Sequence, residues 1–337
     1  MVHIALVGAG LMGTSHIKSL QGNALVTVTG ICDVSKEAAQ RLADTVGANA
    51  YTDLDEMLAK ETIDAVIVAT PDNLHADPVI RCAKAHKHIL CEKPFATTLE
   101  DGRAMLVAIE ENGVICQMAH LFRFLPFYRN VANAVEKGQI GEVLSANLMM
   151  HNRITVPTKM LRWADRSSPS WFLLAHSIDM LLWVNNCRAV SVRATGVKRK
   201  LVSMGVNTYD LIKAEMVLEN SAICTMEANW VMPEGMPINA AVKLTISGTE
   251  GAYETNTGDP ISTLMLPDSY GVQGILEFDV GGYYVGLRRH MLDAFTRTIE
   301  YGAPLVTNAR DGYNALCVLE AIDRSMESGN TVVQVAQ

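Results

Sequence analysis

The chain has 337 residues, of which 49% are hydrophobic and 19% are charged. This length exceeds one ordinary domain, so we expect two, each with enough apolar residues to form a core. The formal net charge of −8 argues against a nucleic-acid partner, because proteins that bind phosphate backbones normally carry a basic surface.

Cysteine usage and the first residues indicate the cellular compartment. The seven cysteines are scattered singly with no C-x-x-C pair, which is typical of reduced thiols in the cytoplasm. The chain opens on an apolar strand pattern and lacks the basic region and cleavage site of a secretory signal. The most apolar window, residues 171–184, contains His176 and Asp179 and is too short to span a membrane. We therefore expect a soluble cytoplasmic protein with no membrane partner.

Residues 1–119 alternate between strand-like and helix-like patterns. Short apolar runs separated by amphipathic stretches are typical of a parallel sheet with helices on both faces. Right-handed crossovers then give a doubly wound Rossmann sheet, so we expect an α/β domain. The expected strands are 4–7, 26–32, 65–69, 88–91 and 114–117, and the expected helices are 12–20, 36–46, 54–59, 76–85 and 99–111.

The pattern changes near residue 120. A helix follows Pro126 and ends near Gly138 and Gly141. Longer alternating runs then predict a large, mostly antiparallel open sheet with one face covered by helices, so residues 120–337 are expected to form an α+β domain. The expected strands are 190–197, 211–218, 222–231 and 241–247, and the expected helices are 175–184, 287–301 and 309–328.

A glycine-rich turn follows the first expected strand and opens the first expected helix. In its G-x-G-x-x-G pattern, Gly8 allows a tight turn, Gly10 lets the backbone approach a pyrophosphate, and Gly13 lets the helix pack closely on the strand. The helix N-terminus supplies N–H groups for the phosphates. A glycine turn with no ligand is the alternative, but the strand–turn–helix context favours dinucleotide binding. The motif consists of Gly8, Ala9, Gly10, Leu11, Met12 and Gly13.

Asp33 ends the second expected strand, 20 residues after Gly13. A carboxylate there can accept hydrogen bonds from the adenine ribose and would repel a 2′-phosphate, which favours NAD over NADP. A turn or capping aspartate is the alternative. The nearby Lys36 weakens the preference against NADP.

Five further motifs are spread along the chain. They are A-T-P-x-N-x-H at residues 69–75, C-E-K-P at 91–94, H-x-x-R-F-x-P at 120–126, H-x-x-D at 176–179 and G-T-E-G at 248–251. In these motifs the chain resembles, over essentially its whole length, the glucose–fructose oxidoreductase / inositol dehydrogenase / rhizopine-catabolism (Gfo/Idh/MocA) family. The resemblance implies an N-terminal NAD(P)-binding Rossmann domain, and a C-terminal domain that binds the substrate and forms homodimers or homotetramers.

The resemblance also implies cofactor-binding residues beyond the glycine turn and Asp33. They follow the fourth and fifth expected strands, where ligands bind in open α/β sheets. The set is Thr70, Pro71, Asn73, His75, Glu92, Lys93 and Pro94.

Lys93 is the first catalytic candidate. Because it precedes Pro94, its backbone is restricted to extended conformations, and it follows the carboxyl end of a parallel strand. Its ammonium group can hydrogen-bond a substrate oxygen, and desolvation would lower its pKa towards a useful range. The alternative is an exposed lysine paired with Glu92. The resemblance further implies a cis peptide bond between Lys93 and Pro94.

His176 is the second catalytic candidate. It shares a helix face with Asp179, and histidine is the natural proton acceptor near neutral pH. In dehydrogenases that resemble this chain, the histidine takes the hydroxyl proton while a hydride leaves the same carbon. Asp179 then binds a substrate hydroxyl or orients the imidazole ring. A core histidine with a satisfied hydrogen bond is the alternative.

The segment before His176 departs from the family pattern. Many relatives carry an aspartate four residues before this histidine and a glycine two before it, whereas this chain has Phe172 and Leu174. The residues can act without that carboxylate at a shifted pH, the substrate can be less polar than an inositol, or hydride chemistry can be lost. These alternatives stay open.

Two weaker substrate-binding candidates complete the set. Arg123 can contact an anionic or hydroxylated substrate or form a salt bridge at the domain junction, and Trp163 lies in a segment expected to form the pocket wall. No group of His, Cys, Asp or Glu has metal-ligand spacing, so we expect no metal.

The resemblance implies NAD(H)-dependent oxidation of a secondary alcohol on a sugar, an inositol-like polyol or a glycoside. Two alternatives come from other classes of function. One is redox-neutral cleavage of a glycoside, in which bound NAD is reduced and reoxidised within each turnover. The other is a non-catalytic sensor that retains the NAD site and acts through protein partners.

Overall fold

The computed structural model describes residues 1–161, 163–236, 238–257, 263–266, 269–272, 277–280 and 283–336, with side chains described outside 258–284. The chain divides into two compact units. The first unit contains Met1–Phe124 and Leu276–Leu316, and the second contains Leu125–Ile275 and Cys317–Gln337. The boundary expected between residues 119 and 120 stays a prediction about sequence domains, because the compact units are each built from two segments.

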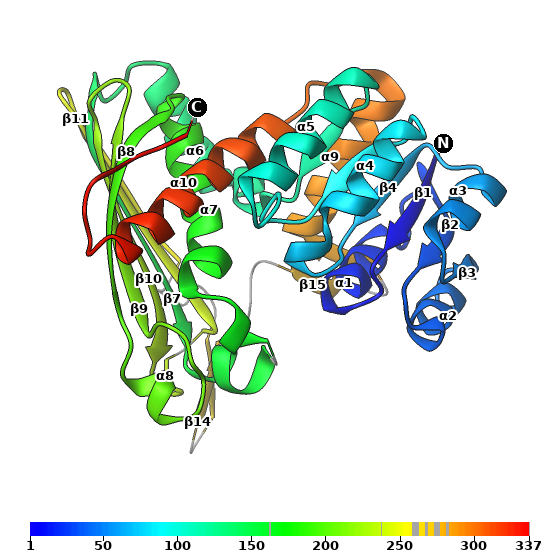
Figure 1. Ribbon diagram of the computed structural model, residues 1–337, viewed down its shortest axis with the longest axis horizontal. Coiled ribbons are helices and arrows are strands. Elements are labelled where there is room, and N and C mark those ends of the chain that lie inside the picture. The colour runs from blue at the N-terminus through cyan, green and yellow to red at the C-terminus, as the bar shows by residue number, and fades with distance from the viewer. Residues whose placement is uncertain are drawn as a thin grey trace. The chain divides into compact units, whose positions relative to one another are not determined.

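The first unit contains a six-stranded sheet in the order β3-β2-β1-β4-β5-β6 (Figure 1). All neighbouring strands are parallel, which confirms the expected doubly wound sheet. All four residues of β4 are fully buried, as a central strand covered on both faces requires. The strands are β1 (Val2–Val7), β2 (Val26–Cys32), β3 (Asn49–Tyr51), β4 (Ala65–Val68), β5 (His88–Cys91) and β6 (Cys116–Met118).

Side-chain caps determine where three helices of the first unit begin. The side chains of Ser35, Asp53 and Thr98 each accept a hydrogen bond from the backbone N–H three residues later, which satisfies a donor that the helix leaves unpaired. Acidic residues in each first turn complement the helix dipole. The helices are α1 (Leu11–Leu20), α2 (Lys36–Asp44), α3 (Leu54–Lys60), α4 (Ala76–Lys84) and α5 (Leu99–Glu111), with 3₁₀ turns η1 (Asp72–Leu74) and η2 (Leu121–Phe124).

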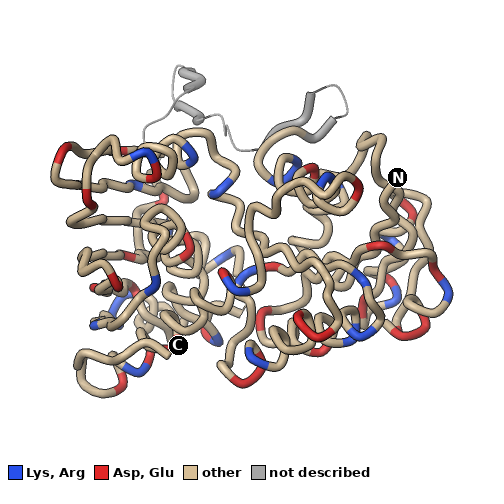
Figure 2. The backbone as a smooth tube through the Cα atoms, turned by 90° about the horizontal axis from the view of Figure 1, so that it is seen from above, with Lys and Arg blue, Asp and Glu red and all other residues tan. Residues whose placement is uncertain are grey.

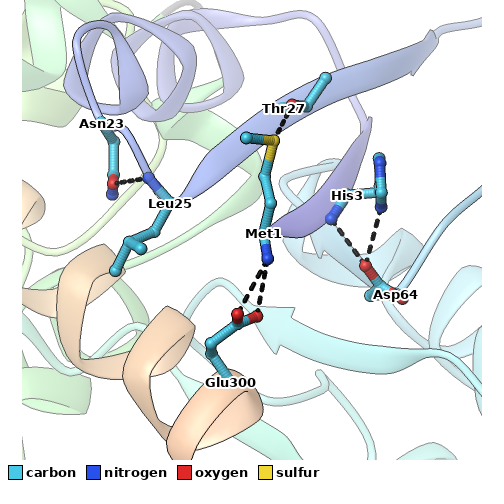
Figure 3. A network of polar contacts seen from close by, with 7 residues as sticks. All are labelled: Met1, His3, Asn23, Leu25, Thr27, Asp64 and Glu300. Carbon is cyan, nitrogen blue, oxygen red and sulfur yellow. Dashed lines mark hydrogen bonds and ion pairs between the residues drawn. The ribbon is translucent and has the colours of Figure 1, made fainter.

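Helix α9 (Leu287–Tyr301) belongs to the first unit, although the sequence analysis placed it in the C-terminal domain. The side chains of Met291 and Phe295 on this helix are fully buried in the same core as those of Ile4 and Ile17. The Met1 amino group lies 2.9 Å from the Glu300 carboxylate, as Figure 3 shows. The first unit is therefore completed by residues almost 300 positions from its first strand.

A buried ion-pair network joins α1, the end of β5 and α9. Glu92 Oε1 lies 2.8 Å from His16 Nε2 and 3.3 Å from Arg288 Nη1, and all three side chains are at most 7% exposed. Burial raises the pKa of Glu92, but the hydrogen bond and charge of His16 and the charge of Arg288 outweigh it and lower this pKa to about 2. The carboxylate is thus held ionised inside the protein.

The second unit contains a seven-stranded sheet in the order β12-β11-β7-β10-β9-β8-β17. Neighbouring strands are antiparallel except β7 and β10, which confirms the mostly antiparallel sheet. The strands are β7 (Val143–Arg153), β8 (Ala189–Val197), β9 (Leu211–Leu218), β10 (Ile223–Met232), β11 (Ala240–Gly248), β12 (Ala252–Asn256) and β17 (Val333–Gln334). A further pair, β13 (Thr263–Leu266) with β14 (Ser269–Val272), belongs to this unit, whereas β15 (Glu277–Val280) with β16 (Tyr283–Gly286) belongs to the first unit.

Side chains on the strands of the second unit alternate between a buried and an exposed face. In β10, Cys224, Met226, Ala228 and Trp230 are buried. Helices α6 and α7 cover the buried face of this sheet, and the opposite face carries no helix in the part of the chain that the structure describes (Figure 1). The remaining helical segments are α6 (Pro126–Glu136), η3 (Val156–Met160), η4 (Ala164–Arg166), η5 (Ser170–Leu174), α7 (Ala175–Asn185), α8 (Lys200–Ser203) and α10 (Ala309–Glu327).

Charged and thiol side chains are distributed over both units. Figure 2 shows Lys and Arg interspersed with Asp and Glu along the described backbone. The seven cysteines are all free thiols, and six of them are buried. Among the described helices, none is both long and apolar enough to cross a membrane.

The Glu92 network makes a prediction about stability. Glu92→Gln removes the carboxylate that compensates the buried Arg288 guanidinium, and loss of one partner of a buried ion pair costs about 3–5 kcal/mol. Urea titrations at pH 7 should therefore give a free energy of unfolding lower by about that amount. Because the Glu92 pKa falls from 4.5 to about 2 on folding, wild type has this stabilisation above pH 4.5 and loses it as the pH falls through about 2.

Glu56→Gln is the matched control. Glu56 forms an exposed pair with Lys60 one helical turn away, and such pairs contribute about 0.3–0.5 kcal/mol. A Glu92→Gln variant as stable as this control at pH 7 would contradict the structural role of the buried carboxylate.

Candidate active site

Four adjacent strands of the first unit end at one edge of the sheet, and each end carries one of the predicted motifs. In sheet order these strands are β2, β1, β4 and β5, all parallel. Asp33 follows β2, the glycine turn follows β1, residues 70–75 follow β4, and residues 92–94 follow β5. The carboxyl ends of parallel strands are where ligands bind in open α/β sheets, and the structure brings these cofactor candidates together there.

The three glycines of the turn differ in the space around them. A Cβ atom on Gly8, whose φ is +99°, would lie 2.5 Å from the carbonyl oxygen of Ala69, and one on Gly13 would lie 1.9 Å from that of Gly8. A Cβ on Gly10 would meet nothing within 4 Å. Gly8 and Gly13 are therefore required by the turn itself, whereas Gly10 leaves space at the start of α1, as the approach of a pyrophosphate requires.

The start of α1 suits an anion. Gly10 caps the helix without a side-chain hydrogen bond, and the first turn holds no acidic residue. The first backbone N–H groups of the helix and its positive dipole end then remain available for a phosphate. Leu11 is 75% exposed at the same turn. The residues present thus fit a dinucleotide, and Ala9, Leu11 and Met12 complete its predicted turn.

Asp33 is tied to the glycine turn. Its Oδ2 accepts a hydrogen bond of 2.7 Å from the N–H of Ala9, and its Oδ1 accepts one of 2.8 Å from the N–H of Ser35. Each carboxylate oxygen retains a second lone pair that a ribose hydroxyl can use. Asp33 can therefore stabilise the turn and bind the adenine ribose at the same time.

His75 links the segments that follow β4 and β5. Its buried ring has Nδ1 2.8 Å from the carbonyl oxygen of Pro94 and Nε2 3.1 Å from that of Thr70. The Thr70 hydroxyl donates to the carbonyl of Leu74, which closes the short turn, while Pro71 and Asn73 are exposed at its surface. The turn is thereby fixed against the residues that carry Lys93.

Lys93 precedes a cis peptide bond to Pro94, as expected from the resemblance. Its backbone N–H donates to Glu92 Oε2 at 3.2 Å, and its side chain is half-buried. Glu92 is buried and bound to His16 and Arg288, and the positive charge of Lys93 also contributes to lowering its pKa. Glu92 therefore holds the backbone at position 93 in place.

Asp72 is a further candidate site residue, which the sequence analysis did not name. Burial raises the pKa of its carboxyl group, and the positive charges of Lys93 and then His75 oppose that increase. The carboxyl group therefore lies within electrostatic reach of the Lys93 ammonium. The sequence feature that could have identified Asp72 is its position between Pro71 and Asn73, inside a motif that was already expected to bind the cofactor.

Arg123 lies in η2 of the first unit, after β6. Its guanidinium is 6% exposed and lies 3.3 Å from Asp311 and 3.2 Å from the carbonyl oxygen of Val306. These contacts give Arg123 a structural role within the first unit, and its contact with substrate stays a prediction.

His176, Asp179 and Trp163 belong to the second unit. His176 is half-buried and Asp179 is 2% exposed on α7. The ring of Trp163 lies against that of Phe172, which in turn lies against Trp230, with centroid separations of 5.9 and 5.8 Å. The position where many relatives carry an aspartate is thus part of an aromatic cluster.

The described residues contain no group of His, Cys, Asp or Glu that could hold a metal ion. The first unit offers a lysine ammonium, carboxylates and a dinucleotide-binding turn, and the second unit offers the imidazole of His176.

Comparison with known proteins places these features in a family. Residues 2–120 match the model of an oxidoreductase family with an NAD-binding Rossmann fold, and residues 132–335 match the C-terminal α/β domain of the same family. An inositol 2-dehydrogenase of Rhizobium meliloti (strain 1021) is 26% identical over 335 residues, which covers 96% of this chain and 97% of that protein.

Two further similarities are to a dehydrogenase named for another substrate and to a solved structure. A 4-carboxy-2-hydroxymuconate-6-semialdehyde dehydrogenase of a Sphingobium species is 29% identical over 68% of this chain and 72% of that protein. The structure of scyllo-inositol dehydrogenase from Lactobacillus casei, with bound NAD(H) and scyllo-inositol, has a TM-score of 0.85 at 20% identity and covers all of both chains.

The family models match both parts of the chain, and the solved structure has the same fold along its whole length. The expected fold class, the NAD-binding domain and the oxidoreductase class are confirmed. The chain therefore belongs to the Gfo/Idh/MocA oxidoreductase family.

Proposed function

We propose that this protein is an NAD-dependent dehydrogenase that oxidises a secondary alcohol of a sugar, an inositol-like polyol or a glycoside. The observation that carries the proposal is the edge of the first sheet, where the glycine turn, Asp33, the His75 turn and Lys93 follow adjacent strands. The inositol 2-dehydrogenase similar to this chain along its length supports a polyol or sugar as the substrate class.

The reaction separates a hydride from a proton. When bound, NAD⁺ supplies the acceptor for the hydride that leaves the carbinol carbon. The Lys93 ammonium donates a hydrogen bond to the reacting oxygen and stabilises negative charge that develops there. His176 accepts the hydroxyl proton, so that the alcohol loses one hydride and one proton and becomes a carbonyl.

Other side chains position these groups. Glu92 holds the Lys93 backbone through a 3.2 Å hydrogen bond. Asp179, three residues after His176 on α7, binds a substrate hydroxyl or orients the imidazole. Arg123 and Trp163 are further candidates for contact with the substrate.

We also propose a cytoplasmic homodimer or homotetramer. Seven free thiols support a reducing compartment. The sheet face without helices in the described residues presents Met149 at 36% exposure and Ile223 at 47%, apolar area that a second copy would bury.

Lys93→Ala should slow turnover strongly, because the hydrogen bond to the reacting oxygen is lost. General acid–base groups contribute about 10²–10⁴-fold to rate, and kcat should fall by a factor in that range. The measurement is reduction of NAD⁺ followed at 340 nm with a panel of polyols, aldoses and glycosides. Calorimetry should show that the variant still binds NAD⁺.

Lys84→Ala, an exposed lysine on α4, serves as the matched control and should retain full activity. Equal turnover by Lys93→Ala and wild type would contradict the proposed role. A silent panel with tight NAD⁺ binding would favour redox-neutral glycoside cleavage if glycosides are consumed, and a sensor if they are not.

Asp33→Asn should relax the preference for NAD over NADP. The substitution removes the negative charge that repels a 2′-phosphate, while an amide oxygen can still accept from Ala9. We expect the affinity for NADP⁺ to rise on the order of tenfold, which corresponds to about 1.4 kcal/mol. Calorimetric Kd values for both dinucleotides check this.

Asp44→Asn is the control, because this exposed aspartate at the end of α2 binds only Gln40 among the contacts described. A wild-type protein that binds both dinucleotides equally would contradict the role of Asp33.

Static light scattering at micromolar concentration tests the assembly. We expect a mass two or four times that of the 36.7 kDa chain. A lysine at position 223 (Ile223→Lys) should lower that mass, because a buried unpaired charge opposes the apolar contact. A monomeric wild-type protein would contradict the proposed assembly.

A further inference from the structure

An aromatic cluster in the second unit includes the residue one turn before His176. Phe172 lies in η5, whose last residue leads directly into α7, so residues 172 and 176 lie on one side of a continuous helical segment. The Phe172 ring is tilted by 62° to Trp163 and by 57° to Trp230. The contact with Trp163 is edge-to-face, an arrangement that is favourable for aromatic rings, and the contact with Trp230 is tilted.

The three residues of the cluster differ in burial. Trp230 on β10 is fully buried, whereas Phe172 and Trp163 are half-buried. The preceding residue, Trp171, donates a 2.7 Å hydrogen bond from Nε1 to Asp323 on α10, which anchors the same segment to a second helix. Phe172 therefore has little freedom to turn away from the surface that it shares with His176.

The half-buried residues of this cluster favour one kind of ligand group. A ring edge or face cannot pair with a hydroxyl group, so a hydroxyl pressed against Phe172 would lose its hydrogen bond to water without replacement. An apolar or aromatic group at the same place would bury ring area and release water. A substrate that carries hydroxyl groups on every side therefore gains little binding free energy from contact with Phe172.

We propose that Phe172, flanked by Trp163 and backed by Trp230, is a specificity-determining surface that binds an apolar or aromatic substituent of the sugar substrate. This inference rests on the proposed function and narrows its substrate class to glycosides with an apolar aglycone. Phe172 contacts the substituent, while His176, on the same helical segment, serves the carbinol.

Paired glycosides test the inference. Phenyl and methyl β-D-glucopyranosides, galactopyranosides and xylopyranosides differ within each pair only in the aglycone. With NAD⁺ present, calorimetry should show tighter binding of the phenyl member of at least one pair by wild type, on the order of tenfold, which is the discrimination that apolar pockets give. Phe172→Asn should reduce that ratio towards one, while Phe172→Leu should keep part of it.

Trp183→Phe is the control, because Trp183 lies on α7 under the Arg129 guanidinium and outside the cluster. It should keep the wild-type ratio, and NAD⁺ affinity should be unchanged in all variants. Equal binding within every pair, or an aglycone preference unchanged in Phe172→Asn, would overturn the inference even if NADH is formed. A preference that depends on Phe172 without NADH formation would support it and contradict the dehydrogenase function.

Discussion

The buried ion pairing of the Glu92 carboxylate is the interaction on which the first unit depends most. The carboxylate is buried at the end of β5, where it binds His16 of α1 and Arg288 of α9 and accepts the backbone N–H of Lys93. One side chain thus connects the helix that follows the glycine turn, the strand end that carries Lys93, and a helix from late in the chain. A neutral residue could fill the space, but it could not compensate a guanidinium that is 7% exposed.

The glycine turn could be predicted because its constraints are local. Gly8 and Gly13 are required by contacts within a few residues or with the next strand, and such requirements leave a recognisable spacing. The strand patterns of the first sheet were equally clear, since fully buried strands are short apolar runs. Of the strands of this sheet, only β3 was not predicted, because it has three residues and no apolar run.

The parts that could not be predicted depend on contacts between distant segments. The amphipathic pattern of α9 indicates a helix with one buried face, but not that Met291 and Phe295 pack on the first sheet. In β7 the consecutive Leu148, Met149 and Met150 hide the alternation that identifies a strand. Likewise, Phe172 was recognisable as a departure from the family, whereas its contacts with Trp163 and Trp230 come from three segments of the fold.

The position of α9 in the first unit also has a consequence for how the chain is made. When residues 1–119 have left the ribosome, the strands of the first sheet exist, but the helix that buries part of Ile4 and Ile17 has not been synthesised. The core of this unit can close only after about 180 further residues have emerged, most of which belong to the second unit. The unit that begins first is therefore completed late, and the apolar surface that α9 covers stays without this helix throughout that interval.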